Sequence, residues 1–162
     1  METIPCAQTR ILFLTRGQFA LIDELDYEKV KGYAWYPSWN EDGQCFYVMT
    51  KVEGKTTYLH RLIMQPQGKM TVDHINMNPL DNRRCNLRLA TRSQNQMNHK
   101  VQSNNTSGFK GVHLFKRTGK FRAYIMVNGK EKHLGYFVTA EEAHAKYCEA
   151  AKEMHGEFAR TR

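Results

Sequence analysis

Short apolar runs separated by turn residues dominate the first third of the chain. Apolar runs at 11–14 and 19–22 flank Thr15-Arg16-Gly17, and later aromatic and β-branched runs surround Asn40-Glu-Asp-Gly43. Runs of this length bounded by Gly and Asn are typical of strands joined by hairpin turns. We therefore predict a β-rich leader over residues 1–58.

Residues 59–98 combine short apolar segments with most of the Asp, His and Asn side chains. A strand is predicted to end at Asp73-His74, and a second short strand spans Leu87–Ala90. A helix is predicted from Thr91, because its hydroxyl and the side chain of Gln94 have the spacing of a capping box. The segment therefore predicts a strand, a loop, a second strand and a helix in succession.

Residues 99–108 are polar, rich in Asn and Ser and without hydrophobic periodicity, which predicts a linker. Three strands are predicted beyond it, at 109–115, 120–127 and 130–137. Asn128-Gly129 is a strong hairpin signal, and Thr139 with Glu142 forms a capping box before apolar residues at helical spacing. We expect residues 109–162 to form a three-stranded antiparallel sheet packed on one helix, and the whole chain to be α+β.

Charge favours a polyanionic partner. The chain holds 24 Lys and Arg against 16 Asp and Glu, a net charge of +8. Residues 104–162 hold 11 basic and 6 acidic side chains, against 13 and 10 in residues 1–103, so the shorter segment is the more basic. Such an excess indicates nucleic acid before an anionic membrane, although a basic protein with neither partner is the alternative.

The four cysteines are scattered and form no CxxC pair. Neither a zinc site nor a disulfide framework is therefore expected, and a reducing interior suits them. No apolar run approaches the ~18 residues of a membrane span, and the N-terminus lacks the regions of a signal peptide. We expect a cytoplasmic protein, inside a bacterial or phage-infected cell, with no membrane partner.

Asp73, His74 and Asn95 are the candidates for chemistry. Hydrolysis of a phosphodiester needs a base for water and positive charge at the phosphate. An imidazole with a pKa of ~6.5 suits the first role, and the oxygens of Asp73 and Asn95 suit a hard cation such as Mg²⁺. A lone Asp-His pair is usually a surface pair or a helix cap, so the combined spacing carries this hypothesis.

The same segment resembles the HNH, or ββα-metal, endonucleases, in the branch of phage and intron-associated homing enzymes. The resemblance is carried by His60-Arg-Leu-Ile-Met64, Asp73-His74-Ile-Asn, Leu80-Asp-Asn-Arg-Arg84, Asn86-Leu-Arg and Ser93-Gln-Asn95. It implies that His74 is the general base, that Asp73 and Asn95 bind Mg²⁺ or Mn²⁺, and that Asn86 pins the loop. It also implies an endonuclease domain over residues 1–98, with its ββα-metal core at 59–98.

Other residues of this segment have less specific roles. His60 is a supporting residue by the resemblance, and equally a hydrogen-bonded core histidine. Four arginines are candidate phosphate clamps, or else solvated surface charges: Arg61, Arg83, Arg84 and Arg88. Met77 stands where the resemblance leads us to expect glycine, so this turn position needs an awkward backbone angle.

Residues 107–158 resemble the ethylene-response-factor (Apetala-two) DNA-binding domain. The resemblance is carried by Ser107-Gly-Phe-Lys-Gly-Val112, Gly119-Lys-Phe-Arg-Ala-Tyr-Ile125, His133-Leu-Gly-Tyr-Phe137 and Thr139-Ala-Glu-Glu-Ala143. It implies that the sheet lies in the DNA major groove with the helix behind it. The candidate DNA contacts are Lys110, His113, Phe115, Lys116, Arg117, Arg122, Tyr124, Met126 and His133. Because arginine is scarce among them, we expect weak discrimination between bases. The alternative is that these charges only keep the sheet soluble.

Together these features predict a metal-dependent DNA endonuclease whose C-terminal domain, residues 109–162, tethers it to its target. We expect it to act on double-stranded DNA, as a monomer, by in-line attack of water that leaves 5′-phosphate and 3′-hydroxyl ends. No zinc is expected. A catalytically inactive DNA-binding regulator and an RNA-directed nuclease are the alternatives.

Overall fold

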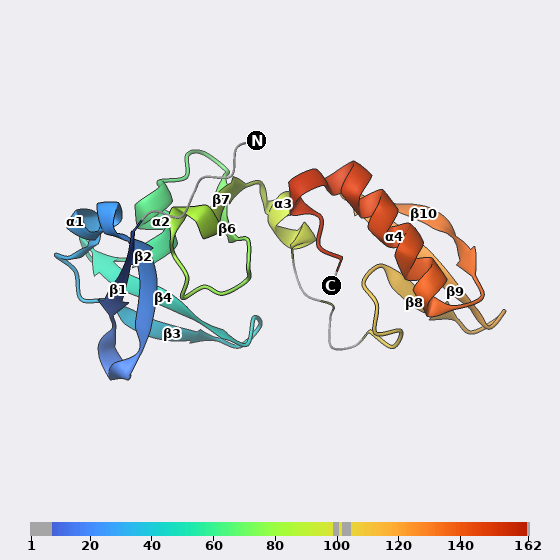
Figure 1. Cartoon of the computed structure of the whole chain (residues 1–162), viewed down its shortest axis with the longest axis horizontal. Coiled ribbons are helices and arrows are strands. Elements are labelled where there is room, and N and C mark those ends of the chain that lie inside the picture. The colour runs from blue at the N-terminus through green and yellow to red at the C-terminus, as the bar shows by residue number, and fades with distance from the viewer. Residues whose placement is uncertain (1–7, 99–100, 102–104, 162) are drawn as a thin grey trace. The chain divides into compact units, whose positions relative to one another are not determined.

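The computed structural model describes residues 8–98, 101 and 105–161, and its fold is α+β. Within these residues the strands form small antiparallel sheets, accompanied by short helices and one long helix (Figure 1). The chain divides into two compact units, Met1–Arg92 and Ser93–Arg162. Each unit is described by itself.

The leader of the first unit forms a hairpin and a three-stranded meander. Its elements are β1 (Thr9–Phe13), β2 (Phe19–Asp23), α1 (Tyr27–Val30), β3 (Tyr36–Asn40), β4 (Cys45–Val52) and β5 (Lys55–Tyr58). β1 pairs with β2, and the other strands form a sheet in the order β3-β4-β5. The two hairpins predicted around Gly17 and Gly43 are therefore confirmed.

The segment after the leader forms a further hairpin with a long polar loop. Its elements are α2 (Leu59–Met64), β6 (Thr71–His74), a short 3-10 helix (Arg84–Asn86), β7 (Leu87–Ala90) and α3 (Arg92–Met97). β6 and β7 pair antiparallel, as the sequence predicts. α3 begins directly after Thr91, at the boundary between the two units.

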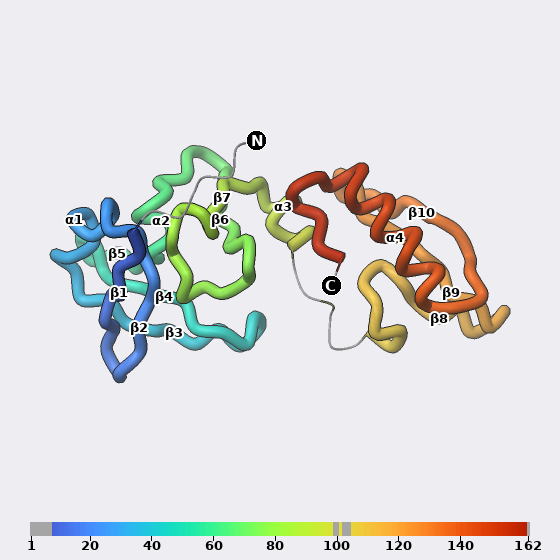
Figure 2. The backbone as a smooth tube through the Cα atoms, in the orientation of Figure 1, coloured from blue at the N-terminus to red at the C-terminus, as the bar shows by residue number. Residues whose placement is uncertain are grey.

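One hydrophobic core joins the leader to this hairpin. It contains buried side chains from β1 and β2, such as Ile22, together with Val48 of β4, Leu59 of α2 and Val72 of β6. The leader also holds the loop between β6 and β7 through the backbone. Leu21 of β2 donates to the Leu80 carbonyl at 2.8 Å and accepts from the Asn82 amide at 2.7 Å, so the loop runs beside β2 (Figure 2).

The second unit is a three-stranded sheet with one long helix along one face (Figure 1). Its elements are β8 (Val112–Phe115), β9 (Lys120–Val127), β10 (Lys130–Phe137) and α4 (Ala140–His155). Ala123 and Ile125 of β9 pack under α4, because alternate residues of a strand share one face. The capping box of Thr139 and Glu142 is confirmed, as are the predicted ranges of β9 and β10.

The strand predicted from Phe109 begins only at Val112. Asn105 and Ser107 cause the difference, since their side chains bind the backbone of a turn that ends at Gly111. Gly111 has φ +70°, and a Cβ there would lie 2.1 Å from the Tyr147 ring. Part of the predicted linker, residues 105–108, thus belongs to a hydrogen-bonded turn, and residues 99–100 and 102–104 lie outside the described residues.

The expectation of wholly reduced cysteines is wrong for Cys85, which is disulfide-bonded. Cys45 and Cys148 form no disulfide. Among the described residues, no helix combines the length and the apolar character needed to cross a membrane.

Candidate functional site

Asp73 and His74 are the last two residues of β6, and both side chains are buried. β7 places Arg88 directly opposite Asp73 in the antiparallel register. The Nε and Nη2 atoms of Arg88 lie 2.8 and 2.7 Å from Oδ2 of Asp73. This pairing orients the carboxylate, and it joins a predicted metal ligand to a predicted phosphate clamp.

His74 lies in a cluster of aromatic rings from the leader and α2. Its ring centroid is 4.9 Å from that of His60 and 6.4 Å from that of Tyr47. Burial lowers the pKa of His74, and this effect outweighs the hydrogen bond to Oδ1 of Asn82 and the carboxylates of Asp73 and Asp81, which raise it. The imidazole is therefore neutral at neutral pH, which is the state that can accept a proton.

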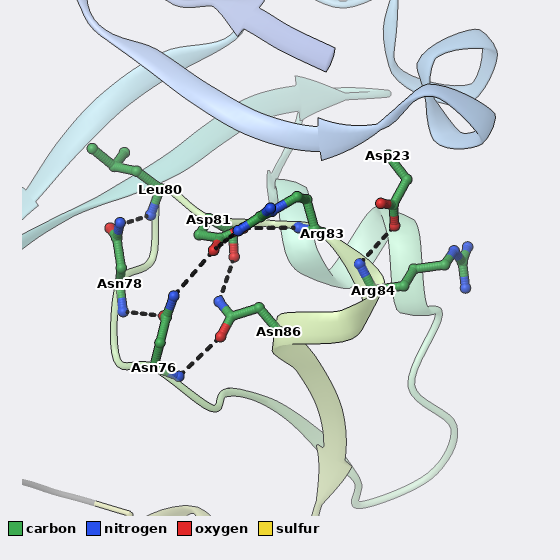
Figure 3. A network of polar contacts seen from close by, with 8 residues as sticks. All are labelled: Asp23, Asn76, Asn78, Leu80, Asp81, Arg83, Arg84 and Asn86. Carbon is green, nitrogen blue, oxygen red and sulfur yellow. Dashed lines mark hydrogen bonds and ion pairs between the residues drawn. The ribbon is translucent and has the colours of Figure 1, made fainter. Parts of the chain in front are cut away.

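The loop between β6 and β7 is held by a network of polar side chains (Figure 3). Asn86 accepts from the backbone N–H of Asn76 at 2.9 Å and donates to the carbonyl of Asp81 at 2.7 Å. Asn76 in turn donates to the Asp81 carboxylate at 3.0 Å. The network fixes the loop that follows His74. Met77 has φ +63°, the left-handed conformation that the sequence predicts for this turn.

Two other predicted phosphate clamps are paired with carboxylates of the first unit. Arg83 contacts Asp81 through Nε at 2.8 Å and Nη2 at 2.7 Å. Arg84 makes the same two-point contact with Asp26 of the leader, at 2.7 and 2.8 Å. The Arg83 pair therefore lies within the loop, the Arg84 pair joins the loop to the leader, and the Arg61 side chain is exposed on α2.

His60 is a buried neighbour of His74, on the first turn of α2. Burial, together with the charges of His74 and Arg61, lowers its pKa to about 3. The unfolded chain binds a proton at this residue below about pH 6.5, while the folded protein does not. Stability is therefore lost as the pH falls from about 6.5 toward 3.

We expect this loss to depend on His60 itself. Below its unfolded pKa, a group that is neutral when folded and charged when unfolded reduces the free energy of unfolding by about 1.4 kcal/mol for each pH unit. Between pH 7 and pH 5, His60→Phe is therefore expected to lose about 2 kcal/mol less stability than the wild type. Urea unfolding at the two pH values measures this. Equal losses in both proteins would show that His60 does not titrate in this way.

Comparisons with known proteins cover the segment that contains these residues. A family model described as HNH endonuclease matches residues 57–97. An "Uncharacterized HNH endonuclease L560" of Acanthamoeba polyphaga mimivirus is 34% identical over 150 residues, which cover 89% of this chain and 74% of that protein. This chain belongs to the HNH endonuclease family.

A second relative matches a shorter part of this HNH chain. "Protein 3.8" of Escherichia phage T7 is 40% identical over 60 residues, 37% of this chain and 50% of that protein. No solved structure matches the chain. The family model ends at residue 97, so the likeness of the second unit to the ethylene-response-factor domain stays a prediction.

The HNH segment contains donors that fit a hard divalent cation. The Asp73 carboxylate is a buried oxygen donor at the end of β6, and Asn95 is a half-buried amide on α3. Asn95 belongs to the second unit, so its meeting with Asp73 stays a prediction. In the described part of the chain, no group of three His, Cys, Asp or Glu could hold a metal.

The second unit of this HNH protein presents an aromatic sheet face opposite α4. Strand register places His113 beside Arg122, and His133 beside Tyr124. Arg122 is paired with Glu131, and its Nε donates to Nδ1 of His133 at 3.3 Å. The other predicted DNA contacts on this face are Phe115 and Met126. The sheet thus gathers most of the predicted contacts on one surface.

The remaining predicted contacts lie elsewhere in the unit. Lys116 and Arg117 are exposed at the turn between β8 and β9. Lys110 is half-buried, and its Nζ donates to the carbonyl of Met97 at 2.5 Å. Burial lowers the pKa of Lys110 to about 8. Lys116 and Arg117 are therefore the better candidates for contacts to phosphate.

Sequence reasoning assigned no role to three residues of these sites. Asn82 contacts His74, Asp26 pairs with Arg84, and Tyr136 packs its ring 5.5 Å from Phe115 on the exposed sheet face. Strand alternation from Tyr124 and Arg122 across the hairpin could have found Tyr136. No sequence signal marks the other two, because the partner of Asp26 is distant in the chain and Asn82 lies in an irregular loop.

Proposed function

We propose that this protein hydrolyses phosphodiester bonds of double-stranded DNA, with His74 as the general base. The observation that carries the proposal is the buried imidazole of His74, next to Asp73 in the sequence at the end of β6, with a pKa that burial lowers. A neutral imidazole can take a proton from a water as that water attacks phosphorus. Family membership supports nuclease chemistry for this chain.

The neighbouring residues would orient the reacting groups. Arg88 holds the Asp73 carboxylate, and Asn86 holds the loop that follows His74. We assign Asp73 and Asn95 as the residues that hold Mg²⁺ or Mn²⁺. A bound divalent cation would neutralise charge on the phosphate and on the leaving oxygen. In-line attack by the water that His74 deprotonates would leave a 5′-phosphate and a 3′-hydroxyl.

The test is cleavage of supercoiled plasmid DNA, with matched DNA and RNA duplexes as competing substrates. We expect Mg²⁺-dependent nicking or linearisation of DNA that stops when EDTA is added, with no cleavage of the RNA duplex. Preferred cleavage of RNA would favour an RNA-directed nuclease. Binding of DNA without cleavage, in Mg²⁺ or Mn²⁺, would favour the inactive regulator.

We further propose that the exposed face of β8–β10 docks on DNA. This face is rich in aromatic and histidine side chains, and the turn between β8 and β9 adds the exposed cations of Lys116 and Arg117. A narrow antiparallel sheet fits the ~12 Å major groove of DNA. The basic excess of residues 104–162 also supports the assignment.

Removing the turn cations is expected to weaken binding in a salt-dependent way. Each lost phosphate contact reduces the slope of log K against log salt by about 0.9, so Lys116→Ala/Arg117→Ala should flatten the slope by about 2. Titrations of labelled duplex at several salt concentrations measure the slope. Lys152→Ala, on the exposed side of α4, is the control and should leave the slope unchanged. An unchanged slope in the double variant would refute docking through this turn.

A further inference from the structure

Asn82 is a buried side chain in the loop between β6 and β7, and its side chain is 0% exposed. Its backbone N–H donates to the Leu21 carbonyl at 2.7 Å, which attaches this part of the loop to β2. Its side-chain Nδ2 donates to the Pro79 carbonyl at 3.0 Å. Its Oδ1 lies 3.4 Å from Nε2 of His74. The side chain therefore links the loop backbone to the imidazole.

The two contacts of the amide fix its orientation. A carbonyl oxygen such as that of Pro79 only accepts hydrogen bonds, so the amide group that faces it is the NH₂. Rotating the amide by half a turn would place two oxygens against each other in a buried site, which is costly. The Oδ1 atom therefore faces His74, and it too can only accept.

The orientation of Asn82 determines which nitrogen of His74 carries the proton. A neutral imidazole has one N–H and one lone pair, and the partner of one nitrogen sets the role of the other. Because Oδ1 of Asn82 only accepts, Nε2 of His74 is the donor. The lone pair then belongs to Nδ1.

We infer that Asn82 is a positioning residue that holds His74 as the Nε2–H tautomer, so that Nδ1 is the atom that takes the proton from the attacking water. The inference rests on the proposed function of His74 as the base. Asn82 touches neither substrate nor metal in this scheme. It acts through the imidazole, and β2 of the leader holds it in place through Leu21.

Two substitutions separate the contacts of Asn82. Asn82→Leu has a similar volume but removes both the acceptor for His74 and the donor for Pro79. Asn82→Asp keeps an acceptor for Nε2–H, but it places a carboxylate oxygen against the Pro79 carbonyl and adds a negative charge. Asn78→Ala is the matched control, since Asn78 caps the Leu80 amide in the same loop without contacting His74.

The experiment combines ¹⁵N NMR of histidine-labelled protein with single-turnover cleavage of DNA. In the wild type, the ring nitrogens of His74, assigned by comparison with His74→Ala, should show protonated Nε2 and unprotonated Nδ1. Asn82→Leu should lose this single tautomer and cleave about 10²-fold more slowly, without a matching change in DNA affinity. Asn82→Asp should keep the tautomer and cleave faster than Asn82→Leu, while Asn78→Ala should match the wild type in both measurements.

Two results would overturn the inference. One is a wild-type His74 protonated at Nδ1, a measurement that needs no variant to fold. The other is an Asn82→Leu protein with the wild-type tautomer and the wild-type cleavage rate. Failure of the proposed function is a separate outcome. In that case His74→Ala would cleave DNA as fast as the wild type, although NMR of the wild type would still show His74 protonated at Nε2.

Discussion

His74→Ala is expected to cleave DNA about 10³-fold more slowly than the wild type. The substitution removes the only group assigned to accept a proton from water, and a positioned general base contributes roughly 10²–10⁴ in rate. The affinity for DNA should change little, because the proposed docking face lies on β8–β10. Single-turnover cleavage of supercoiled plasmid, together with gel-shift titration in EDTA, separates the two quantities.

The control must remove a buried imidazole without touching the site. His155→Ala does this in the second unit, where the ring of His155 is buried and contacts the Met126 carbonyl at 2.9 Å. That variant should cleave within a few-fold of the wild-type rate, provided that it remains folded at the assay temperature. If His74→Ala keeps the wild-type rate, the base must be another residue, and the neutral His60 beside it would be the next candidate.

Local patterns account for the parts of the fold that the sequence could predict. The ranges of β9 and β10 follow from alternation on either side of Asn128-Gly129, and α4 begins where the capping box of Thr139 places it. In both cases the determining interactions lie within a few residues of each other. The left-handed turn at Met77 could be expected for the same reason, since a tight turn restricts few residues.

The candidate site depends on contacts that no local pattern specifies. The imidazole of His74 is buried by rings from β4 and α2, and Asn82 reaches it from an irregular loop. Arg83 and Arg84, which the sequence predicts as phosphate clamps, form ion pairs with Asp81 and Asp26 instead. An arginine near a catalytic motif has the same sequence signature whether it faces solvent or an internal Asp, and only tertiary packing decides between them.

The second large effect is expected in stability. Asp26 is 1% exposed in its side chain and is paired with Arg84, whose Nη2 also donates to the Ile63 carbonyl of α2. Arg84 thus connects the leader, α2 and the loop after β6. Arg84→Met should reduce the free energy of unfolding by about 3–5 kcal/mol, because it leaves a buried carboxylate with Lys29 as its remaining cationic partner.

A double substitution tests whether the cost comes from the uncompensated charge. Asp26→Leu/Arg84→Met removes both members of the pair, and replacing a buried ion pair by apolar residues is often neutral. The double variant should therefore be more stable than Arg84→Met alone. Lys31→Met, which breaks the exposed pair with Glu28, is the control and should change stability by less than about 1 kcal/mol. If the double variant is no more stable than Arg84→Met, lost packing of the guanidinium causes the effect.

The pH dependence gives a second, independent check of this pair. Burial alone would raise the pKa of Asp26, but its hydrogen bonds with Arg84 and Lys29 outweigh burial and lower the pKa. A carboxyl with a lowered pKa contributes stability that is complete above its unfolded pKa of about 4 and is lost as the pH falls through the folded value. Urea unfolding should therefore show a loss of wild-type stability below about pH 4 that is smaller in Asp26→Leu/Arg84→Met, since that variant has no Asp26 to protonate. An equal loss in both proteins would assign the acid sensitivity to other carboxylates, Asp81 first among them, whose pKa Arg83 also lowers against the effect of burial.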